Sequence, residues 1–184
     1  PAKKVGAGYT AHIVDIVRSD VDRDYRPSDV SVAPDGSLFI ADWFDPVDCC
    51  HRTINDAGRI FRVAPAGHTY VVPAYDYQTP VGAVQALRSP NLSARYRAWA
   101  ALVGMQTHAL AELESMAADP NPRFRARALW VLAAIDDGAA RAIKMALRDE
   151  SEDVRSVALR ITRRHRMPVE PVVRRLVQDD SALV

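Results

Sequence analysis

Two stretches of sequence, set 30 residues apart, decide the fold of the second half of the chain. Residues 119–131 read DPNPRFRARALWV, and residues 149–161 read DESEDVRSVALRI. An earlier copy, residues 89–101, reads SPNLSARYRAWAA. Apolar, small and charged residue classes that recur together at one fixed interval are typical of repeat proteins, whose units each pack against the next. The sequence therefore predicts a layered repeat fold in this half.

Each repeat is expected to contain two helices. In the clearest copy, residues 139–148 form the predicted shorter helix and residues 152–164 the longer one. One column of the repeat holds only small residues, which let neighbouring helices approach closely: Ala98, Ala128 and Ala158. Because a single helix pair cannot cover its own apolar face, the pairs must stack. We predict an α-solenoid over residues 81–184, with a period of about 30 residues.

Another column of the repeat holds arginine. The column contains Arg95, Arg125 and Arg155. Asp119 and Asp149 precede its last two members by six positions. Opposite charges at fixed positions in successive layers can link turn to helix and layer to layer. We interpret these residues as a structural ladder, because ion-pair networks are often architectural. The alternative is a basic groove for an anionic ligand. Ser89 replaces the first acidic residue, so the first layer is expected to be irregular.

Residues 1–80 have a different composition, with many Asp residues and short β-branched or aromatic runs. Four strands are predicted, over residues 11–17, 29–32, 38–41 and 59–63. Pro34-Asp35-Gly36 stands between the second and third, where an Asp-Gly pair indicates a hairpin. The predicted fold class is therefore α+β in separate segments: a small antiparallel β-sheet in residues 1–80, followed by the α-solenoid. So small a sheet would be marginal by itself.

One polar cluster leaves the third predicted strand and enters a long loop. Its candidate functional residues are Asp42, Asp45, Cys49, Cys50 and His51. Asp, Cys and His can all bind metals, but adjacent cysteines strain a single tetrahedral site and no second cysteine pair exists. A vicinal disulfide would fit an exported protein. The simpler interpretation is a loop with turn-forming Asp residues and a surface His.

The composition excludes several other classes. The chain has 24 Lys and Arg against 23 Asp and Glu, so its net charge of +1 argues against a general nucleic-acid binder. No apolar run approaches the roughly 20 residues of a membrane-spanning helix. No phosphate-binding Gly loop, paired-carboxylate motif or nucleophile–base pair is recognisable. We assign no catalytic, cofactor-binding or metal-binding residue.

Two segments of the chain together resemble a known family. The run from Arg26 to Asp45, which contains APDGSLFIADWFD, and the later run GRIFRV (58–63) resemble the final blade of a glucose/sorbosone dehydrogenase-like β-propeller. The arginine-rich repeats, with Arg125-Ala126-Arg127-Ala128-Leu129-Trp130, resemble HEAT-like repeats of a short variety. The combination is similar to PVC-type membrane-bound dehydrogenases of Planctomycetes and Verrucomicrobia. Asp42, Trp43, Asp45, Arg59 and His51 match family-like positions without an assigned chemical role.

The resemblance implies a function for the chain as part of a larger protein. Residues 1–80 would be an incomplete propeller blade with its linker, and the repeats would break off within a further layer after Asp179. The chain itself would be non-catalytic and hold no cofactor, while the parent family suggests haem c and a quinone. The solenoid surface would bind other domains of the same protein or another protein, in the periplasm or cell envelope. The alternative is a protein-binding scaffold with no link to redox chemistry.

Overall fold

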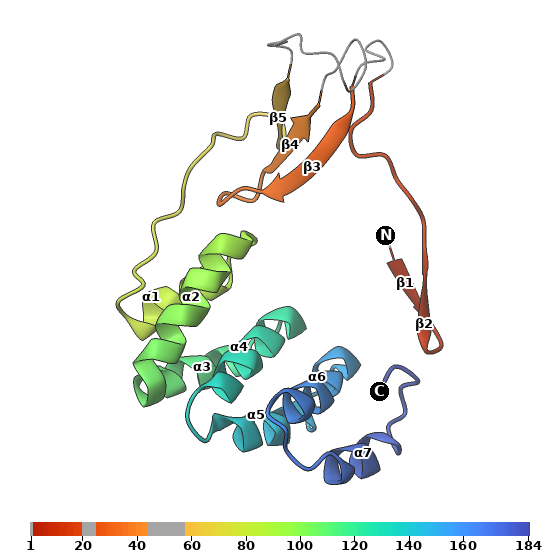
Figure 1. Cartoon of the computed structure of the whole chain (residues 1–184), viewed down its shortest axis with the longest axis vertical. Coiled ribbons are helices and arrows are strands. Elements are labelled where there is room, and N and C mark those ends of the chain that lie inside the picture. The colour runs from red at the N-terminus through yellow and green to blue at the C-terminus, as the bar shows by residue number, and fades with distance from the viewer. Residues whose placement is uncertain (1, 20–24, 44–57) are drawn as a thin grey trace, which may run out of the picture. The chain divides into compact units, whose positions relative to one another are not determined.

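The computed structural model describes residues 2–19, 25–43 and 58–184, and it places strands before helices along the chain (Figure 1). The strands are β1 (Ala2–Val5), β2 (Gly8–Ala11), β3 (Pro27–Val32), β4 (Leu38–Asp42) and β5 (Arg59–Val63). The helices are α1 (Pro80–Leu87), α2 (Leu92–Met105), α3 (Leu110–Ala117), α4 (Pro122–Ala134), α5 (Gly138–Ala146), α6 (Glu152–Arg164) and α7 (Glu170–Leu176), with a short 3-10 helix at Gln106–Ala109. The predicted fold class, small antiparallel sheets followed by a helical segment, is confirmed.

The residues group into two compact units. One unit contains Pro1–Ile13, Tyr75–Arg88 and Arg95–Val184, and the other contains Val14–Ala74 and Ser89–Ala94. The first is called here the helical unit and the second the sheet unit. Among the described residues, no helix is both long enough and apolar enough to cross a membrane.

The sheet unit is built on one antiparallel sheet in the order β3-β4-β5. Val30 pairs with Ile40, and Ile40 pairs in turn with Phe61. Gly36 closes the turn between β3 and β4 at a φ of 88°, a conformation that glycine adopts without strain. The backbone N–H of Gly36 donates to the carbonyl of Ala33 at 2.9 Å. The strands expected at 29–32, 38–41 and 59–63 and the turn between the first two are therefore present.

The strand predicted at residues 11–17 is wrong. Only Ala11 of that run is in a strand, and it pairs with Ala2 in a separate hairpin, β1-β2. Val5 faces Gly8, so the loop holds two residues, and its Gly6 has a φ of 56°. Ile13 and Ile16 are 96% and 76% exposed, so the apolar alternation there does not form the buried face of a strand. The described residues thus form two small sheets instead of one.

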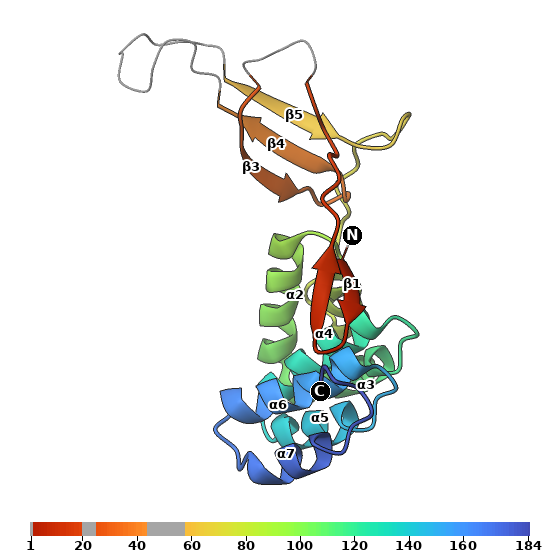
Figure 2. The ribbon, with the colours of Figure 1, turned by 90° about the vertical axis from the view of Figure 1, so that its right-hand side faces the viewer.

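The helices of the helical unit alternate between short and long, as the repeat predicts (Figure 2). The predicted pair 139–148 and 152–164 corresponds to α5 and α6. Thr79 and Asn121 cap α1 and α4, their side chains accepting the N–H groups of Gly82 and Arg123. Each of these two helices then starts with a proline, which has no N–H to leave unsatisfied.

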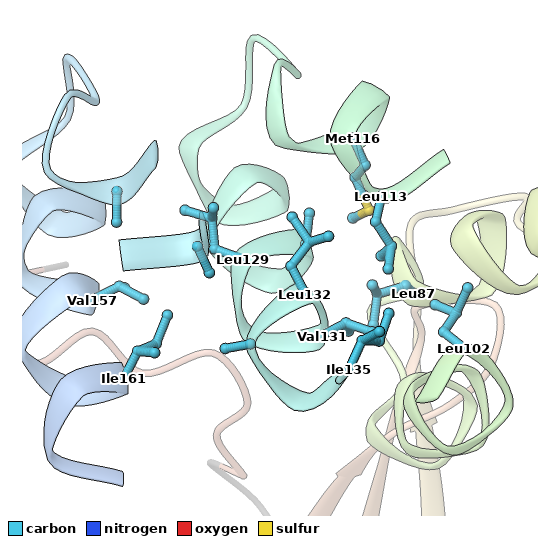
Figure 3. Close-up of a cluster of buried hydrophobic side chains, with 14 of the residues drawn as sticks. Leu87, Leu102, Leu113, Met116, Leu129, Val131, Leu132, Ile135, Val157 and Ile161 are labelled. Atoms are coloured by element: carbon cyan, nitrogen blue, oxygen red, sulfur yellow. The ribbon is translucent and has the colours of Figure 1, made fainter. Parts of the chain in front are cut away.

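The core of the helical unit runs continuously through its layers (Figure 3). Leu102 of α2, Leu132 of α4 and Ile161 of α6 are all fully buried. The column of small residues is also fully buried: Ala98, Ala128 and Ala158 are each 0% exposed. Every layer therefore shares its apolar surface with the next, and such a stack stabilises each pair through its neighbours.

Candidate functional site

The arginine column forms fixed contacts in the second and third layers. Arg125 on α4 donates from Nε and Nη2 to the two carboxylate oxygens of Asp149, at 2.8 and 2.7 Å. Its Nη1 donates to the backbone carbonyls of Asp119 and Pro120, at 2.9 and 3.2 Å. The Arg125 side chain is only 7% exposed and that of Asp149 9%. One guanidinium therefore joins the turn before its own helix to the turn before the next long helix.

Arg155 repeats this arrangement one layer further on. Its Nε and Nη2 donate to the carboxylate of Asp179, at 2.6 and 2.7 Å. Its Nη1 donates to the carbonyls of Asp149 and Glu150, at 3.0 and 2.9 Å. Hydrogen bonding to these carboxylates raises the pKa of both arginines.

The aspartates of the ladder also shape their own turns. One oxygen of Asp119 accepts the N–H of Asn121, and Asp149 and Asp179 do the same for Ser151 and Ser181, at 2.8 to 3.0 Å. Asp119 and Asp149 therefore stabilise the turns two residues before the N-caps of α4 and α6, which are Asn121 and Ser151. Each aspartate both forms a turn and receives an arginine from the preceding layer.

Asp179 gives the ladder a measurable pH dependence. The hydrogen bond from Arg155, with that from the N–H of Ser181, lowers the pKa of Asp179 to about 2. In an unfolded chain the pKa of Asp is about 3.9. The lower folded pKa adds stability above the unfolded value, and this stability is lost as pH falls toward the folded value. We expect Asp179→Asn to flatten the loss of stability between about pH 5 and about pH 2, measured by urea denaturation. An unchanged pH profile in this variant would contradict the pairing.

Arg95 departs from the predicted ladder. Asp119 follows it by the same interval that separates Arg125 from Asp149, but Asp119 instead forms an ion pair with Arg88. Within the described part of the chain, the Nε of Arg95 is buried and has no hydrogen-bond partner. The first layer is therefore irregular, as expected from Ser89: Arg88 replaces Arg95 as the partner of Asp119. Arg88 precedes α2 and its proximity to Asp119 was not evident from the repeat.

Three arginines of α2 and α4 lie near enough to repel one another, and we call Arg95, Arg123 and Arg127 the arginine cluster. Arg127 donates from Nη1 to the carbonyl of Leu87 at 2.9 Å, and its guanidinium lies 5.4 Å from the ring centroid of Phe124. Burial lowers the pKa of Arg127, and the neighbouring charges of Arg95 and Arg123 lower it further. α2 and α4 carry no acidic residue. The lack of acidic residues in these two segments is visible in the sequence, but our prediction did not use it.

In the sheet unit, Asp42 makes contacts that stabilise the structure. Its side chain is fully buried and accepts the N–H of Arg26 at 2.6 Å and the Nε of Arg59 at 2.8 Å. Asp42 and Arg59 face each other across β4 and β5, while Trp43 is 64% exposed. Asp45, Cys49, Cys50 and His51 lie outside the described residues, so the candidate polar cluster is represented only by Asp42.

A second polar group in the sheet unit was missed by sequence reasoning. Asp35 accepts hydrogen bonds from the N–H and Oγ of Ser37 at 3.0 and 2.7 Å and from Arg62 Nη2 at 3.1 Å, and it also contacts His68 Nε2 at 3.0 Å. Burial raises the pKa of Asp35, but these hydrogen bonds together bring it well below its usual value. The carboxylate lies between Ser37 and His68, whereas a nucleophilic triad needs the His next to the Ser. This group fixes the hairpin and is not a hydrolytic site.

No group of three or more His, Cys, Asp or Glu side chains among the described residues could hold a metal ion. A cavity of about 290 Å³ beside the ladder is lined by charged and amide side chains, including Arg148, Arg175 and Gln178, and by no Ser, Cys or His. These side chains can bind and orient charged groups but provide no nucleophile.

The stacked helix pairs define an α-solenoid, and comparison with known families identifies the kind of repeat. Residues 81–160 match the family model of HEAT repeats. The HEAT-like part of the resemblance is thus confirmed, and the match says nothing of residues 1–80. No curated protein and no solved structure matches the chain. HEAT repeats commonly mediate protein interactions, so the helical unit has the form of an interaction scaffold.

Proposed function

We propose that the chain is a HEAT-repeat scaffold that binds a partner protein or domain through the long helices of its helical unit. The ladder carries this proposal: the buried Arg125 and the half-buried Arg155 fix successive layers to each other and so hold the long helices in a set order. α2 presents Tyr96 to solvent with 70% exposure, stacked on Trp99 at a centroid distance of 6.4 Å. Exposed aromatic side chains of this kind are enriched where proteins bind one another.

We further propose that the scaffold belongs to a larger exported protein of the dehydrogenase type, in which β3-β4-β5 forms part of the last propeller blade. The antiparallel order of these strands and the Asp42–Arg59 contact at their ends support this proposal. Haem c and a quinone would then be held by other parts of that protein, in the periplasm or cell envelope. A scaffold with no redox partner remains the alternative function.

A site-specific photo-crosslinker tests both levels of the proposal. It is placed at Tyr96 on α2, and in a matched control at Lys144 on the short helix α5. Crosslinked products from the source cells are identified by mass spectrometry and the partner is purified and tested again. We expect a product at position 96 and none at position 144, and a haem-containing partner supports the dehydrogenase assignment. No crosslink at position 96, or equal products at both positions, would contradict the scaffold.

A further inference from the structure

The cavity of about 290 Å³ beside the ladder is formed by turns of two successive layers. Its lining comes from residues 147–149, which end the third layer's short helix, and from residues 175–180 at the end of α7, with Arg155 of α6. Leu147 and Leu176 give apolar contact, and the other described lining residues are Arg, Asp or Gln. A cavity of this volume and lining can accommodate a charged side chain of another molecule.

Two of the carboxylates that line the cavity already have partners. Asp149 accepts the Nε and Nη2 of Arg125, and Asp179 accepts those of Arg155. Each of these aspartates therefore uses both of its oxygens on one guanidinium. Asp180 is exposed and forms no ion pair within the described part of the chain.

Three side chains of the lining have donors without acceptors: Arg148, Arg175 and Gln178. All three are exposed, and none makes an ion pair or a side-chain hydrogen bond to any residue that the structure describes. Arg175 lies near enough to the ladder for its charge to lower the pKa of Asp179. Because these donors are exposed, a ligand can reach them from solvent without any rearrangement of the core.

The repeat explains why Arg148 has no carboxylate within the helical unit. Arg148 stands two repeats after Arg88, which forms an ion pair with Asp119 of the next layer. The aspartate in the corresponding position for Arg148 is Asp179, but Arg155 already binds both oxygens of that carboxylate. Arg148 therefore occupies a position that binds a carboxylate in the first layer, and it lacks one here.

We propose that this cavity binds an aspartate or glutamate side chain of a partner protein through Arg148, Arg175 and Gln178. The carboxylate takes on Arg148 the place that Asp119 takes on Arg88. A carboxylate has two oxygens and about four acceptor positions, so Arg175 and Gln178 can donate to it at the same time. The site goes beyond the scaffold function proposed above, because it lies at the turns between layers and adds a contact of defined chemistry.

The charges around the cavity favour a carboxylate over a phosphate. Among the described lining residues, three Arg side chains are balanced by three Asp side chains. A carboxylate brings a single negative charge to Arg148 and Arg175, whereas a phosphate group brings between one and two. The phosphate would therefore meet more repulsion from Asp180 and from the aspartates of the ladder.

The test follows the full chain by NMR during titration with glutamate capped as an amide at both ends, with the equally capped glutamine as control. We expect the Nε–Hε resonances of Arg148 and Arg175 to shift with the capped glutamate alone. Replacing both arginines with Gln should weaken binding about tenfold, at about threefold for each exposed ion pair. Replacing Arg160 and Arg164 with Gln makes the same charge change at exposed positions of α6 outside the lining, and should leave the affinity within about twofold.

Asp180→Asn removes a repelling charge from the lining and should strengthen binding about twofold. The proposal is overturned by equal shifts with the capped glutamine, by equal losses in the two double variants, or by inorganic phosphate that displaces the capped glutamate more strongly than acetate does. The crosslink at position 96 is an independent measurement. Its absence would reject the scaffold and leave this site standing, whereas absent NMR shifts would reject this site and leave the scaffold standing.

Discussion

Replacing Arg125 with Met should lower the free energy of unfolding by about 3 kcal/mol, because it leaves the buried carboxylate of Asp149 without its positive partner. The same change removes the donors to the carbonyls of Asp119 and Pro120. Met is chosen since it fills a similar volume without a polar group. Urea denaturation followed by circular dichroism gives the change in free energy.

Arg95→Met is the matched control for this prediction, because it alters the same column of the repeat one layer earlier. Arg95 has no carboxylate to leave unpaired, and its buried Nε lacks a hydrogen bond among the described residues. We expect a change within about 1 kcal/mol, with either sign. Equal destabilisation by the two substitutions would mean that both arginines hold the layers together, against the contacts described here.

Leu132→Ala should destabilise the chain by about 3 kcal/mol. Leu132 is fully buried in the cluster that joins successive layers, so truncation removes apolar contact and leaves a cavity (Figure 3). Leu92→Ala is the control, since Leu92 is 73% exposed and its loss should change the free energy of unfolding by less than about 0.5 kcal/mol. A small effect of Leu132→Ala would show that the layers do not share one packed core.

The repeat could be predicted from sequence because its evidence is local and periodic. Apolar and small columns at a fixed interval define both the helix pairs and the fully buried Ala98, Ala128 and Ala158. The same interval indicated that Arg125 and Arg155 would stand beside acidic residues. It did not indicate that each arginine reaches the aspartate of the following layer, since the separation of Arg125 from Asp149 depends on how the layers stack.

The remaining features depend on contacts that periodicity does not encode. Arg88 lies outside the repeated column, so its pairing with Asp119 could not be read from the pattern. His68 and Arg62 reach Asp35 because of the path of the chain after β5. The strand prediction at residues 11–17 failed for another reason. Alternating apolar residues suggested a strand, but the two-residue loop that begins at Gly6 directs pairing to earlier residues.

The central claim is that the members of one arginine column differ: Arg125 and Arg155 link layers through aspartates, whereas Arg95 forms no such link to Asp119. Double-mutant cycles measure this most directly, one with Arg125→Gln and Asp149→Asn, the other with Arg95→Gln and Asp119→Asn. The account predicts a coupling energy of at least about 1.5 kcal/mol for the first pair and about zero for the second. Similar coupling energies in both pairs would contradict it.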